Sequence, residues 1–196
     1  DVPQVNVTTK LLVGGPTTST NARGIQAYGS AGTQNILQWN FSATTNGSDI
    51  SLVKTRGTTA TATTAVESGD TLGTLSFAGA DGTTGNVGRA AITGFVDGAV
   101  STSTVPTAIS FTTGTTVGSE RMRITSAGLM GIGTGTPASC AIVDVTSTTL
   151  GFKFPVMTTT QKNAIGTPVA GLVIFDSTLA KLCVYSGSAW QTITST

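Results

Sequence analysis

The sequence predicts a mainly β protein of short antiparallel strands, with a small α+β block at its C-terminal end. Three observations carry this prediction. Thr, Ser, Gly and Ala dominate the composition, and the branched Cβ of Thr suits the pleated surface of a strand. Asn-Gly and Asp-Gly pairs recur between apolar segments and supply the positive φ of hairpin turns. Several segments alternate with period two, and none before residue 137 has helical periodicity.

The first 136 residues divide into an arm and a β-rich body. Residues 1–22 are polar and rich in Thr and Asn, and we expect an N-terminal arm or attachment segment there. Residues 23–136 repeat a short alternating segment followed by a turn, which predicts a shaft or body domain. The strands expected in these residues are 25–28, 36–41, 50–55, 71–78, 90–96, 108–112 and 122–125.

Residues 137–196 predict a small C-terminal tip domain. Thr158 and Gln161 have the spacing of a capping box, and residues 161–165 fill one to two helical turns that Gly166 and Pro168 end. Strands are expected on both sides of this helix. They cover 141–146, 171–175, 181–185 and 190–193, with 176–180 as the hairpin loop between the middle pair.

The charge balance excludes some partners. Only 10% of residues are charged, and ten Lys+Arg nearly cancel nine Asp+Glu. The chain has no basic run, so it lacks the electrostatic footprint of a protein that binds nucleic acid or an anionic membrane. No apolar run reaches the roughly 20 residues that a membrane span needs. Aromatic residues make up 6% of the chain, so a monomer would bury little apolar surface, and three associated copies would bury more.

The two cysteines, Cys140 and Cys183, lie among apolar neighbours, which favours two small buried hydrophobic residues in different strands. A disulfide between them is the alternative. The chain has no His, so it holds neither a Ser-His-Asp triad nor a His metal ligand, and two cysteines alone do not make an ordinary zinc site. We therefore expect no metal and no cofactor.

A pair of carboxylates is the remaining route to catalysis, because glycosidases need only two. The candidates are Glu67 with Asp70 and Asp81 with Asp97. Asp81 and Asp97 each precede a Gly, which is typical of turns, and Glu67 and Asp70 lie in a connecting loop. We therefore expect no catalytic residue and no enzyme activity.

Two motifs resemble modules of tailed-bacteriophage fibre proteins. Residues 120–134 read Glu-Arg-Met-Arg-Ile-Thr-Ser-Ala-Gly-Leu-Met-Gly-Ile-Gly-Thr, which looks like the fibre signature E-R-M-R-I-T-S-x-G-x-x-G-I-G-T. Residues 154–165, Phe-Pro-Val-Met-Thr-Thr-Thr-Gln-Lys-Asn-Ala-Ile, are followed by Gly-Leu-Val-Ile-Phe at 171–175 and by Trp190. This set resembles a small terminal domain that follows such shafts.

The resemblance implies an elongated homotrimer that is made in the host cytoplasm and carried on the virion, on the tail or the capsid. As a tail fibre or head fibre it would be a structural protein that attaches the particle to a glycan or protein of the host surface. Residues 1–22 would contact other virion proteins. One alternative is a head fibre or capsid-decorating protein docked by that arm. A second is a polysaccharide-degrading tailspike.

Residues 120–124 contain the densest charge cluster of the chain, at Glu120, Arg121 and Arg123. Alternation would place Arg121 and Arg123 on one face of a strand and Met122 and Ile124 on the other. The favoured interpretation is a solvated face that supports a buried Met/Ile stripe. The alternative is that Glu120 pairs with an Arg of a neighbouring protomer, so that these five residues make inter-subunit contacts.

The glycines of residues 128–135 do not make a phosphate-binding loop, because the Gly-Lys-Ser/Thr ending is missing and no helix follows. Close approach of three backbones near a threefold axis is the interpretation we favour for them.

The aromatic residues of the last block alternate within apolar strands, which favours a small core. Tyr185 and Trp190 are alternatively candidate contacts at the tip surface, because a ring with an apolar face and a polar edge suits carbohydrate. The five residues concerned are Phe152, Phe154, Phe175, Tyr185 and Trp190.

Overall fold

A computed structural model describes residues 45, 47–48, 50–59, 61–84 and 87–194. Its strands and its helix all lie in the compact unit Leu52–Thr196. The predicted mainly β class, with antiparallel sheets and one short helix, is confirmed. The arm at 1–22 and the strands expected at 25–28 and 36–41 lie outside the described residues.

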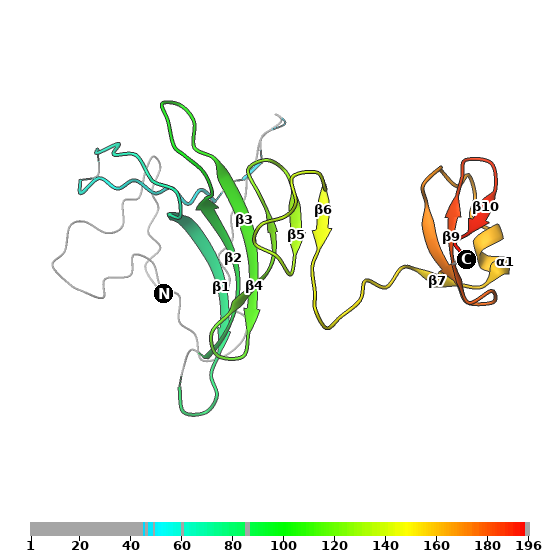
Figure 1. Ribbon diagram of the computed structural model, residues 1–196. Helices are drawn as coiled ribbons and strands as arrows, with labels where there is room; N and C mark the ends of the chain where they lie inside the picture. Colours follow the sequence, from blue (N-terminus) through cyan, green and yellow to red (C-terminus); the bar gives the residue numbers. More distant parts are fainter. Residues whose placement is uncertain (1–44, 46, 49, 60, 85–86, 195–196) are drawn as a thin grey trace. The chain divides into compact units, whose positions relative to one another are not determined.

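Six strands form the first sheet in the order β1-β2-β3-β4-β5-β6, so that neighbours in sequence are neighbours in the sheet (Figure 1). The first five strands pair antiparallel, and β6 runs parallel to β5. The strands are β1 Thr71–Gly79, β2 Val87–Val96, β3 Thr107–Gly114, β4 Ser119–Ile124, β5 Met130–Ile132 and β6 Val143–Val145.

The turn between β1 and β2 uses the Asp-Gly pair that the sequence offers. The Asp81 carboxylate accepts hydrogen bonds from the backbone N–H groups of Thr83 and Thr84. Gly82 has a φ of 91°, a left-handed conformation that glycine adopts without a steric cost. The hairpin therefore turns where the sequence predicts.

Residues 50–55, which we expected to form a strand, belong to no strand of the structure. Their hydrogen bonds go instead to a neighbouring loop. The Thr55 hydroxyl donates to the carbonyls of Ala62 and Thr64, and the Arg56 N–H donates to the Thr64 carbonyl. The alternation of these residues is real, but side chain to backbone bonds compete with sheet pairing here.

The glycine-rich segment contains β5, a strand that the sequence pattern does not predict. Gly128 and Gly133 have φ values of 78° and 74° and turn the chain on either side of this short strand. A Cβ at Gly133 would collide with the carbonyl oxygen of Thr146. The positive φ of both glycines and the close contact at Gly133 therefore account for them within one chain, and no approach of three backbones is needed to explain them.

A β-bulge in β4 brings Glu120 and Arg123 to the same face of the sheet. Met122 pairs with Phe111 and Glu120 with Thr112, which leaves the residue between them without an opposite partner. Residues three apart in a regular strand point to opposite faces, and one inserted residue cancels that offset. Arg123 donates from Nε and Nη2 to the two carboxylate oxygens of Glu120, at 2.6 and 2.8 Å.

The bulge overturns the predicted arrangement of this cluster. Arg121 donates to the Thr113 hydroxyl at 3.3 Å, and Thr113 shares a face of β3 with Phe111, so Arg121 and Arg123 are not side by side. The Arg123 guanidinium lies 5.1 Å from the centre of the Phe95 ring on its own side of the sheet. Within one chain, Glu120 already has its Arg partner.

The second sheet has the order β10-β9-β8-β7, with a short helix beside it (Figure 1). The predicted hairpin between β8 and β9 is present, and β7, which was not predicted, pairs parallel to β8. The elements are β7 Val156–Met157, α1 Thr159–Asn163, β8 Val173–Asp176, β9 Lys181–Tyr185 and β10 Trp190–Thr192.

The two cysteines are both free thiols, and they differ in exposure. Cys183 is buried in β9, as predicted. Cys140 is exposed, so the prediction of a second buried cysteine is wrong. The physical reason is that Cys140 lies in a turn before β6 rather than in a strand.

No helix in the described part of the chain has the length and apolar character that crossing a bilayer requires.

Replacing Arg123 should weaken the first sheet more than replacing Arg121. Arg123→Ala removes a two-point ion pair and a ring contact, and we expect a loss of about 1 kcal/mol in the free energy of unfolding. Arg121→Ala removes one long hydrogen bond and should change it by no more than about 0.5 kcal/mol. Urea unfolding followed by circular dichroism measures both. Equal effects of the two substitutions would contradict the role given to the bulge.

Candidate functional site

The helix of the C-terminal block begins at a complete capping box. Thr158 accepts a hydrogen bond from the backbone N–H of Gln161, and the Gln161 side chain accepts from the backbone N–H of Thr158. This reciprocal pair satisfies two donors at the helix start, as the sequence predicts. It also fixes the direction of a five-residue helix, so that Lys162 points to the sheet rather than to water.

Lys162 forms a buried ion pair with Asp176 at the end of β8. The Nζ lies 2.8 Å from Oδ2, and the two side chains are 6% and 0% exposed. Asp176 also accepts from the Thr159 hydroxyl and from the backbone N–H groups of Thr178 and Leu179. A buried charge needs such partners, because water no longer solvates it. One carboxylate thus ties together α1, β8 and the β8–β9 turn.

These bonds determine the protonation state of Asp176. Burial by itself raises the pKa of this carboxyl group. The hydrogen bonds from Lys162, Thr159 and the two amides outweigh burial and lower the pKa to about 2. Asp176 is therefore ionised throughout the physiological range.

The predicted tip contacts Tyr185 and Trp190 pack on each other. They face each other across β9 and β10, with ring centres 5.4 Å apart and planes at 64°. The Lys162 Nζ lies 5.8 Å from the centre of the Trp190 ring. Both aromatic residues are half-buried, so part of each ring is engaged within the chain.

The face of this sheet that points away from Tyr185 and Trp190 carries a row of apolar side chains. Val156, Phe175 and Leu182 are direct cross-strand neighbours on β7, β8 and β9. Their side chains lie on the same face of the sheet. Ile174 and Cys183, which alternate with them along β8 and β9, are buried on the other face. Val156 is 48% exposed.

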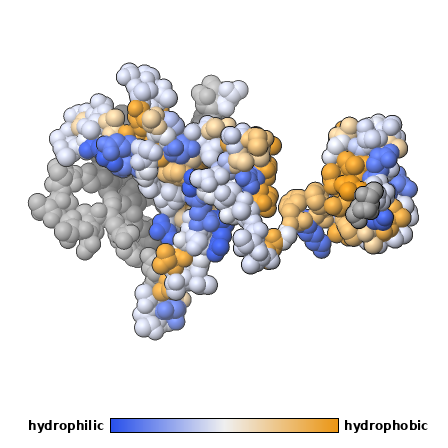
Figure 2. Space-filling model, viewed as in Figure 1, coloured by the Kyte–Doolittle hydropathy of each residue, from blue (hydrophilic) through white to orange (hydrophobic). Residues whose placement is uncertain are grey.

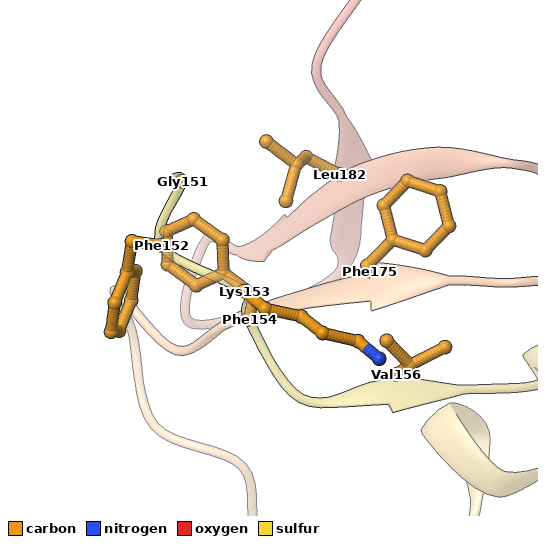
Figure 3. Close-up of a pocket in the computed structure, with 7 residues that line it drawn as sticks. All are labelled: Gly151, Phe152, Lys153, Phe154, Val156, Phe175 and Leu182. Carbon is orange, nitrogen blue, oxygen red and sulfur yellow. The ribbon is translucent and has the colours of Figure 1, made fainter. Parts of the chain in front are cut away.

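Two aromatic residues from the preceding segment complete an open pocket on this face. Phe152 and Phe154 make an edge-to-face contact, with ring centres 5.0 Å apart. Phe152 is 64% exposed, so the expectation that all five aromatic residues lie in the core is wrong for this one. The cavity measures about 610 Å³, and its lining side chains come from segment 151–154, β7, β8 and β9 (Figure 3).

The carboxylates considered for catalysis are tied to basic or backbone groups. Arg56 donates to both oxygens of Asp70 at 2.7 and 2.9 Å and pairs with Glu67 at 2.8 Å. The hydrogen bond from Arg56 holds the pKa of Asp70 well below its usual range. Hydrogen bonds from the amides of Thr84 and Thr83 likewise lower the pKa of Asp81. Among the described residues, no three His, Cys, Asp or Glu side chains are grouped to hold a metal.

The sequence indicated the capping box and the apolar strands but not the buried ion pair. Lys162 lies in a short polar helix and Asp176 at a strand end that reads as a turn. Neither position carries a periodic signal for burial. The exposure of Phe152 was also missed, because its alternation with Phe154 is typical of a strand, and the structure places both residues outside any strand.

Comparison with known families gives one match. Residues 131–196, which include the whole second sheet, match the family model described as phage tail like trimerisation region. This match covers one third of the chain and supports a phage tail-like protein that forms trimers. No curated protein matches the sequence.

Acid should destabilise the C-terminal block in a defined window. The pKa of Asp176 is lowered from 3.8 to about 2 by folding. Its charge therefore stabilises the folded chain above about pH 4, and this contribution is lost as the pH falls from about 4 to 2. Thermal melting followed by circular dichroism should show a falling Tm over that range.

The matched variants for this test are Asp176→Asn and Asp144→Asn. Asp176→Asn should lower Tm at neutral pH and reduce the acid-induced fall in Tm, because it removes one of the titrating carboxylates and leaves Lys162 unpaired. Asp144→Asn changes a half-buried carboxylate of β6 and should leave the acid-induced fall in place. An undiminished fall in Asp176→Asn would contradict the assignment.

Proposed function

We propose that the chain is a structural component of a phage tail fibre, that it works as a homotrimer, and that it attaches the particle to the host surface. The trimer and the phage tail-like character are supported by the match of residues 131–196. The observation that carries the proposal is that this matched segment leaves an apolar sheet face exposed, at Val156 and Phe152.

An exposed apolar face gives association its driving force. Burial of apolar surface contributes about 25 cal/mol per Å² removed from water. In the C-terminal sheet Lys162 of α1 contacts Asp176 and Cys183 on one face, and the described residues hold no second helix to lie over the pocket face of Phe175 and Leu182. In the proposed trimer, each copy covers this face of a neighbour, in a ring closed by a threefold rotation.

Trimerisation also explains how weak contacts at a cell surface become useful. Three identical ends on one particle raise the effective concentration for the second and third contact with a repetitive glycan or protein. The resemblance of residues 120–134 and 154–190 to fibre modules supports this attachment role. Residues 1–22 are the proposed link to other virion proteins.

We propose a structural rather than an enzymatic role. A glycosidase needs one carboxyl group with a raised pKa to act as general acid. Asp70 and Asp81 both have lowered pKa values, because Arg56 and backbone amides stabilise their charged forms. These two residues therefore do not fit the general acid, and for a structural role incubation with bacterial polysaccharide should leave its chain length unchanged.

The oligomeric state tests the central claim. The chain has a mass of 19.6 kDa, and multi-angle light scattering should give three times this value. Val156→Glu places a carboxylate on the apolar face and should dissociate the trimer or lower its Tm by several degrees, because the charge would lose its water. Val169→Glu is the matched control, since Val169 is 68% exposed and lies outside that face.

A monomeric parent chain would overturn the proposed function. Equal behaviour of the two Val→Glu variants would remove the pocket face from the interface. Attachment needs a separate measurement on whole particles. Antibodies against the purified chain should label tail fibres in immunogold electron microscopy, and label on the capsid would identify a head fibre instead.

A further inference from the structure

The six-stranded sheet carries two unbroken apolar ladders on one face. Each step of both ladders is a direct cross-strand pair, so the side chains lie next to one another from strand to strand. Neither ladder contains a charged residue. One ladder is Leu75–Ile92–Phe111–Met122–Ile132–Val145, and the other is Gly94–Ile109–Ile124–Met130–Val143.

In this sheet large apolar side chains are exposed and small or polar ones are buried, which is the reverse of what a solvated monomer would show. Ile92 is 39% exposed and Ile109 is 47% exposed. The residues that alternate with them, Ala91, Ala108 and Ser110, are 5%, 2% and 6% exposed. The covered face thus holds mainly small and polar residues together with Phe95, while Leu75, Ile92 and Ile109 remain on the open face.

The open face extends through all six strands. Leu75 on β1 is 57% exposed, and Val143 and Val145 on β6 are 47% and 44% exposed. Hydrophobic residues gather in the space-filling view where Figure 1 draws β5 and β6 (Figure 2). Free monomers rarely expose contiguous apolar patches larger than a few hundred Å². Such a face is therefore an interaction surface.

The bulge in β4 removes Glu120 from this surface and leaves Arg121 at its end. It turns Glu120 and Arg123 together to the opposite face, where the Thr74–Thr93–Ser110–Arg123 row lies. Arg121 reaches Thr113 at the end of the open face, beyond both ladders. The two ladders themselves carry no charge, so like copies can meet along them without charge repulsion.

The position of the ladder ends in the sequence indicates which partner binds this face. Their last members, Ile132, Val143 and Val145, lie within residues 131–196, the segment that matches a trimerisation region. The matched segment therefore includes part of this face as well as the pocket face. Two ladders that are apolar, uncharged and continuous in sequence with a trimerising segment fit a further copy of the same chain.

We infer that the two ladders pack against the same face of the other protomers, so that the six-stranded sheets of three chains share one apolar core. This inference rests on the proposed homotrimer. It assigns the face of residues 71–145 that points to the threefold axis, and it places the Glu120–Arg123 pair on the outside.

Site-specific photo-cross-linking tests the inference on the full chain. Ile109 is replaced by the photoreactive residue p-benzoylphenylalanine, and Val117 is replaced in the same way as a control. Val117 is 82% exposed in the β3–β4 turn and belongs to neither ladder. Light scattering before irradiation gives the oligomeric state of each variant, and circular dichroism verifies the fold.

We expect irradiation to convert the position-109 variant largely to covalent dimers and trimers on a denaturing gel, and to leave the position-117 variant monomeric. Loss of the trimer in the position-109 variant alone would also support the inference, because it shows that the face is needed for association.

A trimer in which position 109 yields only uncross-linked chains, or links only within its own chain, would overturn the inference and leave the proposed trimer standing. If the unsubstituted chain is a monomer, the proposed function itself fails.

Discussion

Each sheet in the described part of the chain buries side chains on one face and leaves apolar side chains exposed on the other. The association of the protein depends on these exposed faces. In the first sheet the buried residues of one face include the small Ala91 and Ala108, and in the second Lys162 of α1 contacts Cys183 and Asp176 on one face. Large apolar side chains such as Leu75, Ile109 and Val156 lie exposed on the remaining faces. A chain built this way gains further hydrophobic stabilisation when these faces meet other surfaces.

Several charged side chains are paired within the same chain, so they do not need a partner chain. Arg56 holds Glu67 and Asp70, Arg123 holds Glu120, and Lys162 holds Asp176. None of these pairs needs a second chain. The consequence is that apolar contact is left to drive association, and the low charge content noted in the sequence has a structural purpose.

Alternation and turn chemistry were enough to predict most strands, the capping box and the β8–β9 hairpin, because these depend on neighbouring residues. The bulge was out of reach, since it depends on how Phe111 and Thr112 pair with β4 across the sheet. One inserted residue changed which faces Arg121 and Arg123 occupy. Likewise, the burial of Lys162 depends on the position of Asp176, fourteen residues further along the chain. Pairing between segments is a tertiary property, and local patterns do not contain it.

The Asp176 hub has a consequence for the order in which the protein is made. Its partners all lie between Thr159 and Leu179, so the C-terminal block has an internal core that one chain completes alone. The ladders of residues 71–145 have no comparable core on their open face. During synthesis the ladders leave the ribosome before the C-terminal block does. A nascent chain would therefore expose an unpaired apolar sheet until that block has emerged.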